Sequence, residues 1–106
     1  MITIDDFAKM ELVVGTITEV ADHPNADKLL VLQVDAGGEN RQLVAGLKAH
    51  YTAEELTGRQ IVLVANLQPA SLRGVESQGM LLAAQDGDRV VLVAPSDQVS
   101  PGSRIR

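Results

Sequence analysis

The sequence contains no cysteine and no tryptophan, and its only aromatic residues are Phe7 and Tyr51. The absence of cysteine excludes disulfides, thiol nucleophiles and thiolate metal ligands, and it fits a reducing compartment, so we expect a cytoplasmic protein. Proteins that grip unpaired nucleotides usually stack the bases on aromatic rings. An aromatic content of 2% therefore argues against a stacking platform for single-stranded nucleic acid.

Positive charge and long apolar runs are also scarce. The chain has 9 Lys and Arg residues against 14 Asp and Glu residues, a formal net charge of -5, so any nucleic-acid site requires a local basic patch. The longest apolar runs, residues 61–65 and 90–94, fall far below the roughly 18 residues of a membrane helix. The N-terminal residues are acidic where targeting peptides are basic. We therefore expect no membrane span and no targeting segment.

The apolar content is sufficient for one hydrophobic core. Of the 106 residues, 45% are apolar, and with so few aromatics the core must consist of Leu, Val, Ile and Ala. A chain of this length buries enough surface for one core but not for two. We therefore expect residues 1–106 to form a single domain.

Segments rich in β-branched residues and separated by turn residues predict an all-β fold. Gly15 is expected to mark a bulge or bend in the first strand. A short helix is predicted at residues 5–10, capped by Thr3 or Asp5, and a second one after Thr52, which can form a capping box with Glu55. Residues 68–78 are expected to form a loop. The expected strands are residues 11–21, 28–35, 41–45, 60–67, 79–85 and 89–94.

Three strands, a short helix and further strands form the order of the OB-fold, a Greek-key barrel. SH3-like barrels have similar strand counts, but the helix between strands 3 and 4 favours the OB-fold with extra C-terminal strands. Residues 61–65 and 90–94 are apolar at consecutive positions, whereas a solvated face would alternate. We therefore expect both faces of these strands to be covered, by the tail at residues 99–106 or by another subunit.

No catalytic or metal-binding constellation emerges from the sequence. The two candidate metal sets are His23 with Asp22 and Asp27, and His50 with Glu54. Neither supplies three convergent ligands, so no metal or other cofactor is expected, and His23 is predicted to be an exposed turn residue. Ser77 lacks the glycine that a hydrolase elbow places two residues before its serine. There is no glycine-rich phosphate loop. We expect a protein that is not an enzyme.

The segment from residue 66 to residue 80 contains an asparagine at a strand end, a lone arginine, glycines and serines. This composition suits hydrogen bonding to a polar ligand across a barrel mouth. A long loop with turn residues explains the same composition, so both interpretations stay open.

Three stretches, read together, carry a specific pattern. They are Asp5-Asp6-Phe7-Ala8-Lys9-Met10-Glu11-Leu12-Val13-Val14-Gly15, His23-Pro24-Asn25-Ala26-Asp27-Lys28-Leu29, and Val64-Ala65-Asn66-Leu67 with Leu72-Arg73-Gly74-Val75-Glu76-Ser77-Gln78-Gly79-Met80-Leu81-Leu82-Ala83-Ala84. The pattern resembles the tRNA-binding domain of the C-terminus of bacterial methionyl-tRNA synthetases. The same domain serves as the separate β subunit of archaeal enzymes and as a free-standing structure-specific tRNA-binding protein.

The resemblance implies an OB-fold homodimer that recognises the folded shape of tRNA and assists aminoacylation by a methionyl-tRNA synthetase, whose catalytic part is a possible partner. It assigns Lys28, Arg41 and Arg73 to phosphates. Asn66 and Ser77 are assigned to sugar or phosphate, although Asn66 serves equally well to fasten the loop. Met80 completes the implied groove, with core packing as its alternative role.

One departure from the family pattern concerns affinity. Two basic residues commonly follow the Asn-Leu-x-Pro step, but Ala70 and Ser71 stand there in this chain. Because each missing phosphate contact weakens binding, we expect a weaker tRNA binder than a typical member. The alternative function is a protein-interaction or dimerisation module resembling the secretion-chaperone branch of the family.

Overall fold

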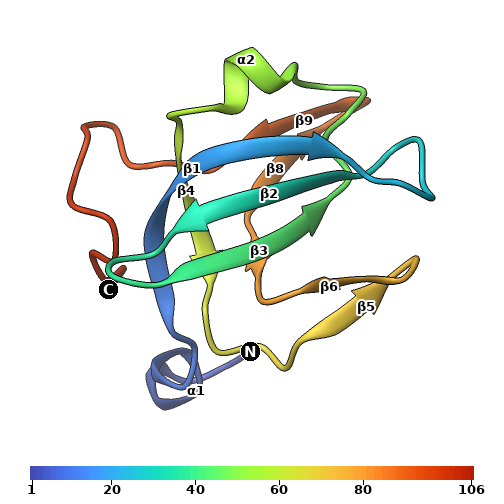
Figure 1. Cartoon of the computed structure of the whole chain (residues 1–106). Helices are drawn as coiled ribbons and strands as arrows, with labels where there is room; N and C mark the ends of the chain where they lie inside the picture. The colour runs from blue at the N-terminus through green and yellow to red at the C-terminus, as the bar shows by residue number, and fades with distance from the viewer.

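The computed structural model describes all 106 residues and shows a β-barrel with two short helices (Figure 1). Three strands precede the second helix and further strands follow it, which confirms the expected OB-type barrel. The elements are α1 (Ile4–Ala8), β1 (Leu12–Asp22), β2 (Leu30–Asp35), β3 (Asn40–Ala45), α2 (Ala53–Leu56), β4 (Gln60–Val64), β5 (Ala70–Leu72), β6 (Val75–Ser77), β7 (Met80–Leu81), β8 (Ala83–Asp86) and β9 (Arg89–Leu92).

The long strand β1 joins the two halves of the main antiparallel sheet, whose order is β3-β2-β1-β4-β7. Its first part pairs with β4 up to Thr16, and its second part pairs with β2 from Thr16 onward. A side chain at Gly15 would lie 2.8 Å from Cδ2 of Leu63, so glycine permits this close approach. The register irregularity falls between Ile17 and Glu19. The bulge therefore lies later in the strand than Gly15, while the close packing occurs at Gly15.

Both helices begin with capping boxes; the sequence predicts the box at Thr52, and for the first helix it predicts a cap at Thr3 or Asp5. Thr3 caps α1 together with Asp6, and Thr52 caps α2 together with Glu55. Leu56 of α2 is fully buried in the barrel core, which is aliphatic as expected. The fully buried side chains of this core are Val14, Ile17, Leu32, Val34, Leu43, Leu47, Leu56, Ile61 and Leu63.

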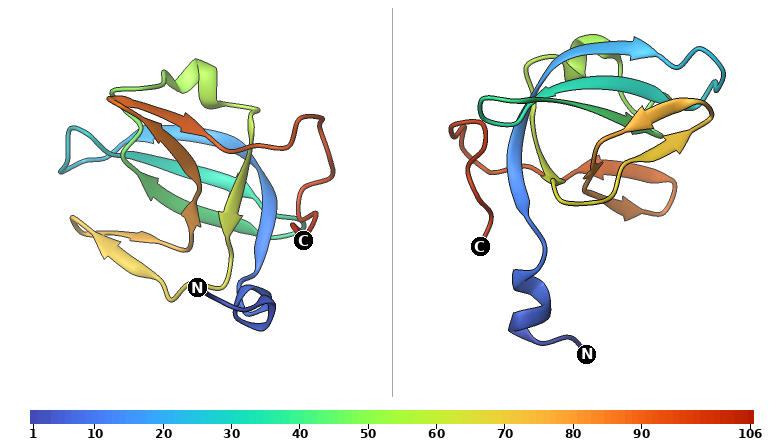
Figure 2. Two further views of the ribbon diagram at one scale, coloured as in Figure 1. Left: turned by 180° about the vertical axis from the view of Figure 1, so that it is seen from behind. Right: turned by 60° about the horizontal axis from the view of Figure 1, so that its bottom comes forward.

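The C-terminal tail runs along the first part of β1 (Figure 2). The Val14 amide donates to the Ser103 carbonyl at 2.9 Å, and the Ile105 amide donates to the Leu12 carbonyl at 2.9 Å. Ile105 packs with Phe7 on a second small core cluster beside β4. Every residue of β4 is buried, so the expected double cover of residues 61–65 is confirmed.

For residues 90–94 a single chain does not supply the full cover, and the expected cover by another subunit stays a prediction. Val91 and Val93 are 36% and 38% exposed. The tail accounts for the difference because it lies against β1 and leaves β9 uncovered.

Residues 68–78 form a hairpin instead of the expected loop. Strands β5 and β6 pair in register from Ala70 with Ser77 to Leu72 with Val75. The turn residues Arg73 and Gly74 both have positive φ, 54° and 91°, as a tight type I′ turn requires. The expected strand at residues 79–85 is also divided into β7 and β8.

Candidate nucleic-acid interface

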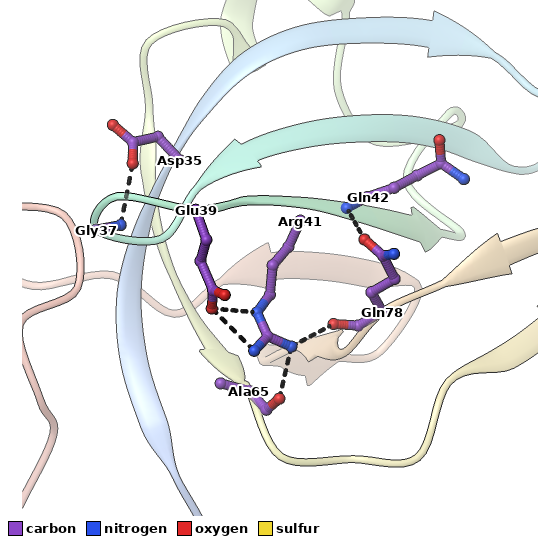
Figure 3. A network of polar contacts seen from close by, with 7 residues as sticks. All are labelled: Asp35, Gly37, Glu39, Arg41, Gln42, Ala65 and Gln78. Carbon is purple, nitrogen blue, oxygen red and sulfur yellow. Dashed lines mark hydrogen bonds and ion pairs between the residues drawn. The ribbon is translucent and has the colours of Figure 1, made fainter.

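Side chains close the barrel between β3 and the end of β6 (Figure 3). The amide of Gln42 donates to Oε1 of Gln78 at 2.9 Å, and the amide of Val44 donates to Oγ of Ser77 at 3.0 Å. The Ser77 hydroxyl in turn donates to the Gly79 carbonyl at 2.9 Å, and Ser77 is 5% exposed. Its expected contact with sugar or phosphate is therefore corrected to barrel closure, because both hydrogen-bonding roles of the hydroxyl are used inside the protein.

Arg41 belongs to the same closure (Figure 3). Its Nη1 donates to the carbonyls of Ala65 at 2.6 Å and Gln78 at 3.0 Å, and its Nε and Nη2 both lie 2.9 Å from Oε1 of Glu39. The side chain is 24% exposed. The guanidinium ties the end of β4 to the segment after β6, so it is not positioned as the free phosphate ligand that the sequence suggested.

Asn66 fastens the chain entering β1 to the chain leaving β4. Its Oδ1 accepts from the Glu11 amide at 2.9 Å, and its Nδ2 donates to the Lys9 carbonyl at 2.7 Å. The structure therefore favours the fastening role over a contact with RNA. For Met80 the structural role is the one that fails. The residue is 52% exposed, so the core packing proposed as its alternative role is wrong.

Lys28 and Arg73 come together in one depression of about 400 Å³. Neither forms an ion pair, whereas four of the other cations do: Lys9 with Asp6, Arg41 with Glu39, Lys48 with Asp22, and Arg89 with Asp86. The depression is lined by Asn25, Ala26, Asp27, Lys28, Leu29 and Arg73. Of the six residues implied by the resemblance, these two are the unpaired cations that the fold places side by side.

Two loops build this depression. One connects β1 to β2, and the other is the turn of the β5–β6 hairpin, which lies between β4 and β7; the two lie beside each other in Figures 1 and 2. Oligonucleotides bind OB-folds at the corresponding pair of loops and on the adjoining face of strands 2 and 3. Arg73 occupies a left-handed backbone conformation that non-glycine residues rarely adopt, and such strain concentrates at functional sites.

A row of amide side chains crosses the β2–β3 face. Nδ2 of Asn40 donates to Oε1 of Gln33 at 2.8 Å, and Nε2 of Gln33 donates to Oε1 of Gln42 at 3.1 Å. Nε2 of Gln42 then donates to the carbonyl of Glu76 at 2.8 Å. These neutral groups suit hydrogen bonds to ribose and phosphate, and sequence analysis missed them because scattered glutamines form no recognisable motif.

His23 is also placed differently from its prediction. It was expected to be an exposed turn residue, but it is 6% exposed and holds the β1–β2 loop against the hairpin. Its Nε2 lies 2.8 Å from the Leu72 carbonyl, and its Nδ1 accepts from the Asn25 amide at 2.9 Å. The sequence shows turn chemistry at this point but not the distant hairpin that covers the imidazole.

Two carboxyl groups have shifted pKa values, and both belong to helix caps. The hydrogen bond from the Thr3 amide lowers the pKa of Asp6, and the hydrogen bond from the Thr52 amide lowers the pKa of Glu55. No group of three or more His, Asp or Glu side chains is arranged to hold a metal ion. No helix is long and apolar enough to cross a membrane.

The fold and the depression define an OB-fold module with features of a nucleic-acid binder. A family model described as "Putative tRNA binding domain" matches residues 12–104, so the chain belongs to this family of tRNA-binding domains. Methionine–tRNA ligase of Thermococcus kodakarensis is 61% identical over 105 residues, which cover 99% of this chain and 14% of the relative. The chain thus spans about one seventh of the length of that relative.

Solved structures agree with the family assignment. A MetRS-related protein from Pyrococcus horikoshii has a TM-score of 0.92 and 36% identity, and the match covers 100% of this chain and 98% of that one. The chaperone CsaA of Bacillus anthracis has a TM-score of 0.90 and 30% identity, with coverage of 100% and 99%. The comparisons support the tRNA-binding interpretation rather than the alternative protein-interaction module.

Proposed function

We propose that this domain binds folded tRNA by its shape, through Lys28 and Arg73 in the depression and the adjoining amide row, with Met80 as a further exposed contact. The observation that carries the proposal is that two cations without carboxylate partners lie together in a depression between the two ligand-binding loops of an OB-fold. Unpaired cations are available to neutralise phosphates.

The two aromatic residues support structured RNA as the ligand. Phe7 packs against the small core cluster beside β4. The Tyr51 hydroxyl accepts from the Leu92 amide at 3.1 Å, and the guanidinium carbon of Arg59 lies 5.1 Å from the centre of its ring. Both rings therefore have roles within the protein. Folded RNA is read through phosphates and 2′-hydroxyls, which Lys, Arg, Asn and Gln contact without stacking.

The domain itself is proposed to be non-catalytic and to assist a methionyl-tRNA synthetase in the cytoplasm, either as one of its parts or as a partner. The relatives that it matches are methionine–tRNA ligases, of which it corresponds to about one seventh. In this arrangement the domain raises the local concentration of tRNA near an active site located elsewhere, an effect that follows from linking two binding modules.

A homodimer is also proposed, with a second copy covering the exposed side chains of β9 and of Val93, which directly follows it. Val91 and Val93 remain accessible there, although consecutive apolar residues usually indicate a strand covered on both faces. Measurement of the solution mass tests this proposal. A mass of one chain at micromolar concentration would exclude the dimer while leaving the RNA site unaffected.

Competition binding tests the main proposal. The chain is titrated with folded tRNA in the presence of either unlabelled tRNA or a single-stranded oligonucleotide of equal charge. We expect the folded tRNA to compete and the oligonucleotide to compete poorly, because no aromatic side chain is free to stack its bases. Equal competition by both would overturn recognition of tRNA shape.

A further inference from the structure

One buried imidazole connects the two loops that carry the unpaired cations. We infer that His23 is a positioning residue for RNA binding, which presents Arg73 at a fixed place by bonding both to the hairpin and to the loop facing it. The inference rests on the proposed tRNA-binding function and adds to it a residue that need not touch RNA.

The hydrogen bonds of His23 define its chemical form. The Asn25 amide can only donate, so Nδ1 must carry a lone pair, and the Leu72 carbonyl can only accept, so Nε2 must carry the proton. Both requirements are met by the neutral imidazole with the Nε2–H tautomer. With 6% exposure, the ring has little access to water that would replace either partner.

Each partner of the imidazole has a direct connection to Arg73. Leu72 immediately precedes Arg73, so the bond to its carbonyl holds one end of the strained turn. Asn25 has its amide fixed by Nδ1 of His23, and its own carbonyl accepts from Nη2 of Arg73 at 3.2 Å. The imidazole thus fixes two groups: the backbone that precedes Arg73, and the Asn25 carbonyl that orients the Arg73 guanidinium.

Positioning has a clear physical benefit at this site. Arg73 is exposed on a two-residue turn, and an exposed arginine loses rotamer entropy when it binds a phosphate. A guanidinium that is already oriented toward the depression loses less on binding. Lys28 lies in the loop that His23 anchors, so the separation between the two cations is set by the same contacts.

Two substitutions of His23 by residues with amide side chains each keep one hydrogen bond of the imidazole and remove the other. His23→Asn places an oxygen where Nδ1 accepts from the Asn25 amide, as in an Asx-turn, but it is too short to reach Leu72. His23→Gln reaches the position of Nε2 and keeps a donor for the Leu72 carbonyl. Matching substitutions at His50, which lies beside Tyr51 away from the depression, provide controls.

The measurement is tRNA affinity of the whole chain for these variants, alone and combined with Arg73→Gln. We expect His23→Asn, which loses the bond to the hairpin, to raise Kd about three- to tenfold, the range that one hydrogen bond controls. His23→Gln, which loses only the bond that fixes the Asn25 amide, should raise Kd by less than His23→Asn. Arg73→Gln should add little in the His23→Asn background, because the two residues act as one unit. Unchanged affinity of His23→Asn, or fully additive effects, would overturn the inference.

A second readout does not depend on RNA. Side-chain ¹⁵N spectra of the unmodified protein should show His23 with a protonated Nε2 and an unprotonated Nδ1; the opposite tautomer would overturn the inference even if a variant failed to fold. The amide resonances of Arg73 and Gly74 should move in His23→Asn and stay in place in His23→Gln. If the unmodified chain does not bind folded tRNA, the proposed function fails, while these spectra still decide whether His23 positions Arg73.

Discussion

The Ser77 hydroxyl accepts a hydrogen bond from the Val44 amide at 3.0 Å and so occupies a place in the barrel where a backbone carbonyl would normally lie. Strand β3 has no continuous ladder on this side; one backbone bond, from the Gln78 amide to the Gln42 carbonyl at 2.7 Å, is supplemented by the side chains of Ser77 and Gln78. Ser77, which the resemblance assigns to sugar or phosphate, is therefore a structural element of the closed barrel.

Ser77→Ala should destabilise the domain and leave RNA affinity of the folded fraction nearly unchanged. The substitution leaves the Val44 amide buried without a partner, at a cost of about 1–3 kcal/mol. Urea denaturation measures the free energy of unfolding, and a tRNA titration measures affinity. Lost affinity with unchanged stability would show that Ser77 contacts RNA after all.

Gly15→Ala should destabilise the barrel by about 1–3 kcal/mol through overpacking. The added methyl group would lie 2.8 Å from Cδ2 of Leu63 and would also press on Val34. Gly46→Ala is the matched control, because the nearest atom to its added carbon is Cδ2 of Leu29 at 3.9 Å. Thermal unfolding of both variants should show a large difference, and equal melting temperatures would contradict the close packing at Gly15.

Lys28→Gln and Arg73→Gln should each lower the salt dependence of tRNA binding by about one unit in the slope of log K against log salt. The reason is that each removes one cation that releases counterions from phosphates. Arg89→Gln is the control, because Arg89 pairs with Asp86 on the β8–β9 hairpin. Titrations across several salt concentrations give the slopes, and equal slopes for all three variants would place the RNA elsewhere.

One of the two substitutions Ala70→Lys and Ser71→Lys should strengthen tRNA binding and steepen its salt dependence. Both positions are exposed on β5, next to the turn that carries Arg73. Because neighbouring residues of a strand point to opposite faces, only one of Ala70→Lys and Ser71→Lys should produce the gain. The same titrations measure it. An unchanged slope for both variants would contradict a role for β5 in the RNA interface.

The Thr52–Glu55 capping box should stabilise the fold more at neutral pH than in acid. Hydrogen bonds lower the pKa of Glu55 in the folded state, so its contribution is present above its unfolded pKa and is lost as pH falls through the folded pKa. The stability advantage over Glu55→Gln should therefore shrink between about pH 7 and about pH 3. Denaturation at both pH values measures this difference, and a constant difference would contradict a role for the carboxylate charge.

The amino-acid sequence by itself determined the elements with local causes. The capping box at Thr52, a helix cap at Thr3 or Asp5, and apolar runs bounded by turn residues all depend on neighbours a few positions away. The order of strands and helices along the chain, and with it the OB-type barrel, was therefore predictable. The family pattern added tRNA binding, and the family model matches residues 12–104 of the 106. The β5–β6 hairpin was missed because its strands are short and carry few β-branched residues.

Only the tertiary structure decided which polar side chains are available to bind RNA. Arg41, Asn66 and Ser77 have the chemistry of RNA ligands, yet each bonds to backbone groups far away in the sequence. Lys28 and Arg73 line a shared depression without carboxylate partners, although Arg73 also donates to one distant backbone group, the Asn25 carbonyl. Availability of a side chain depends on what the folded chain places beside it, and contacts between distant segments cannot be read from local sequence.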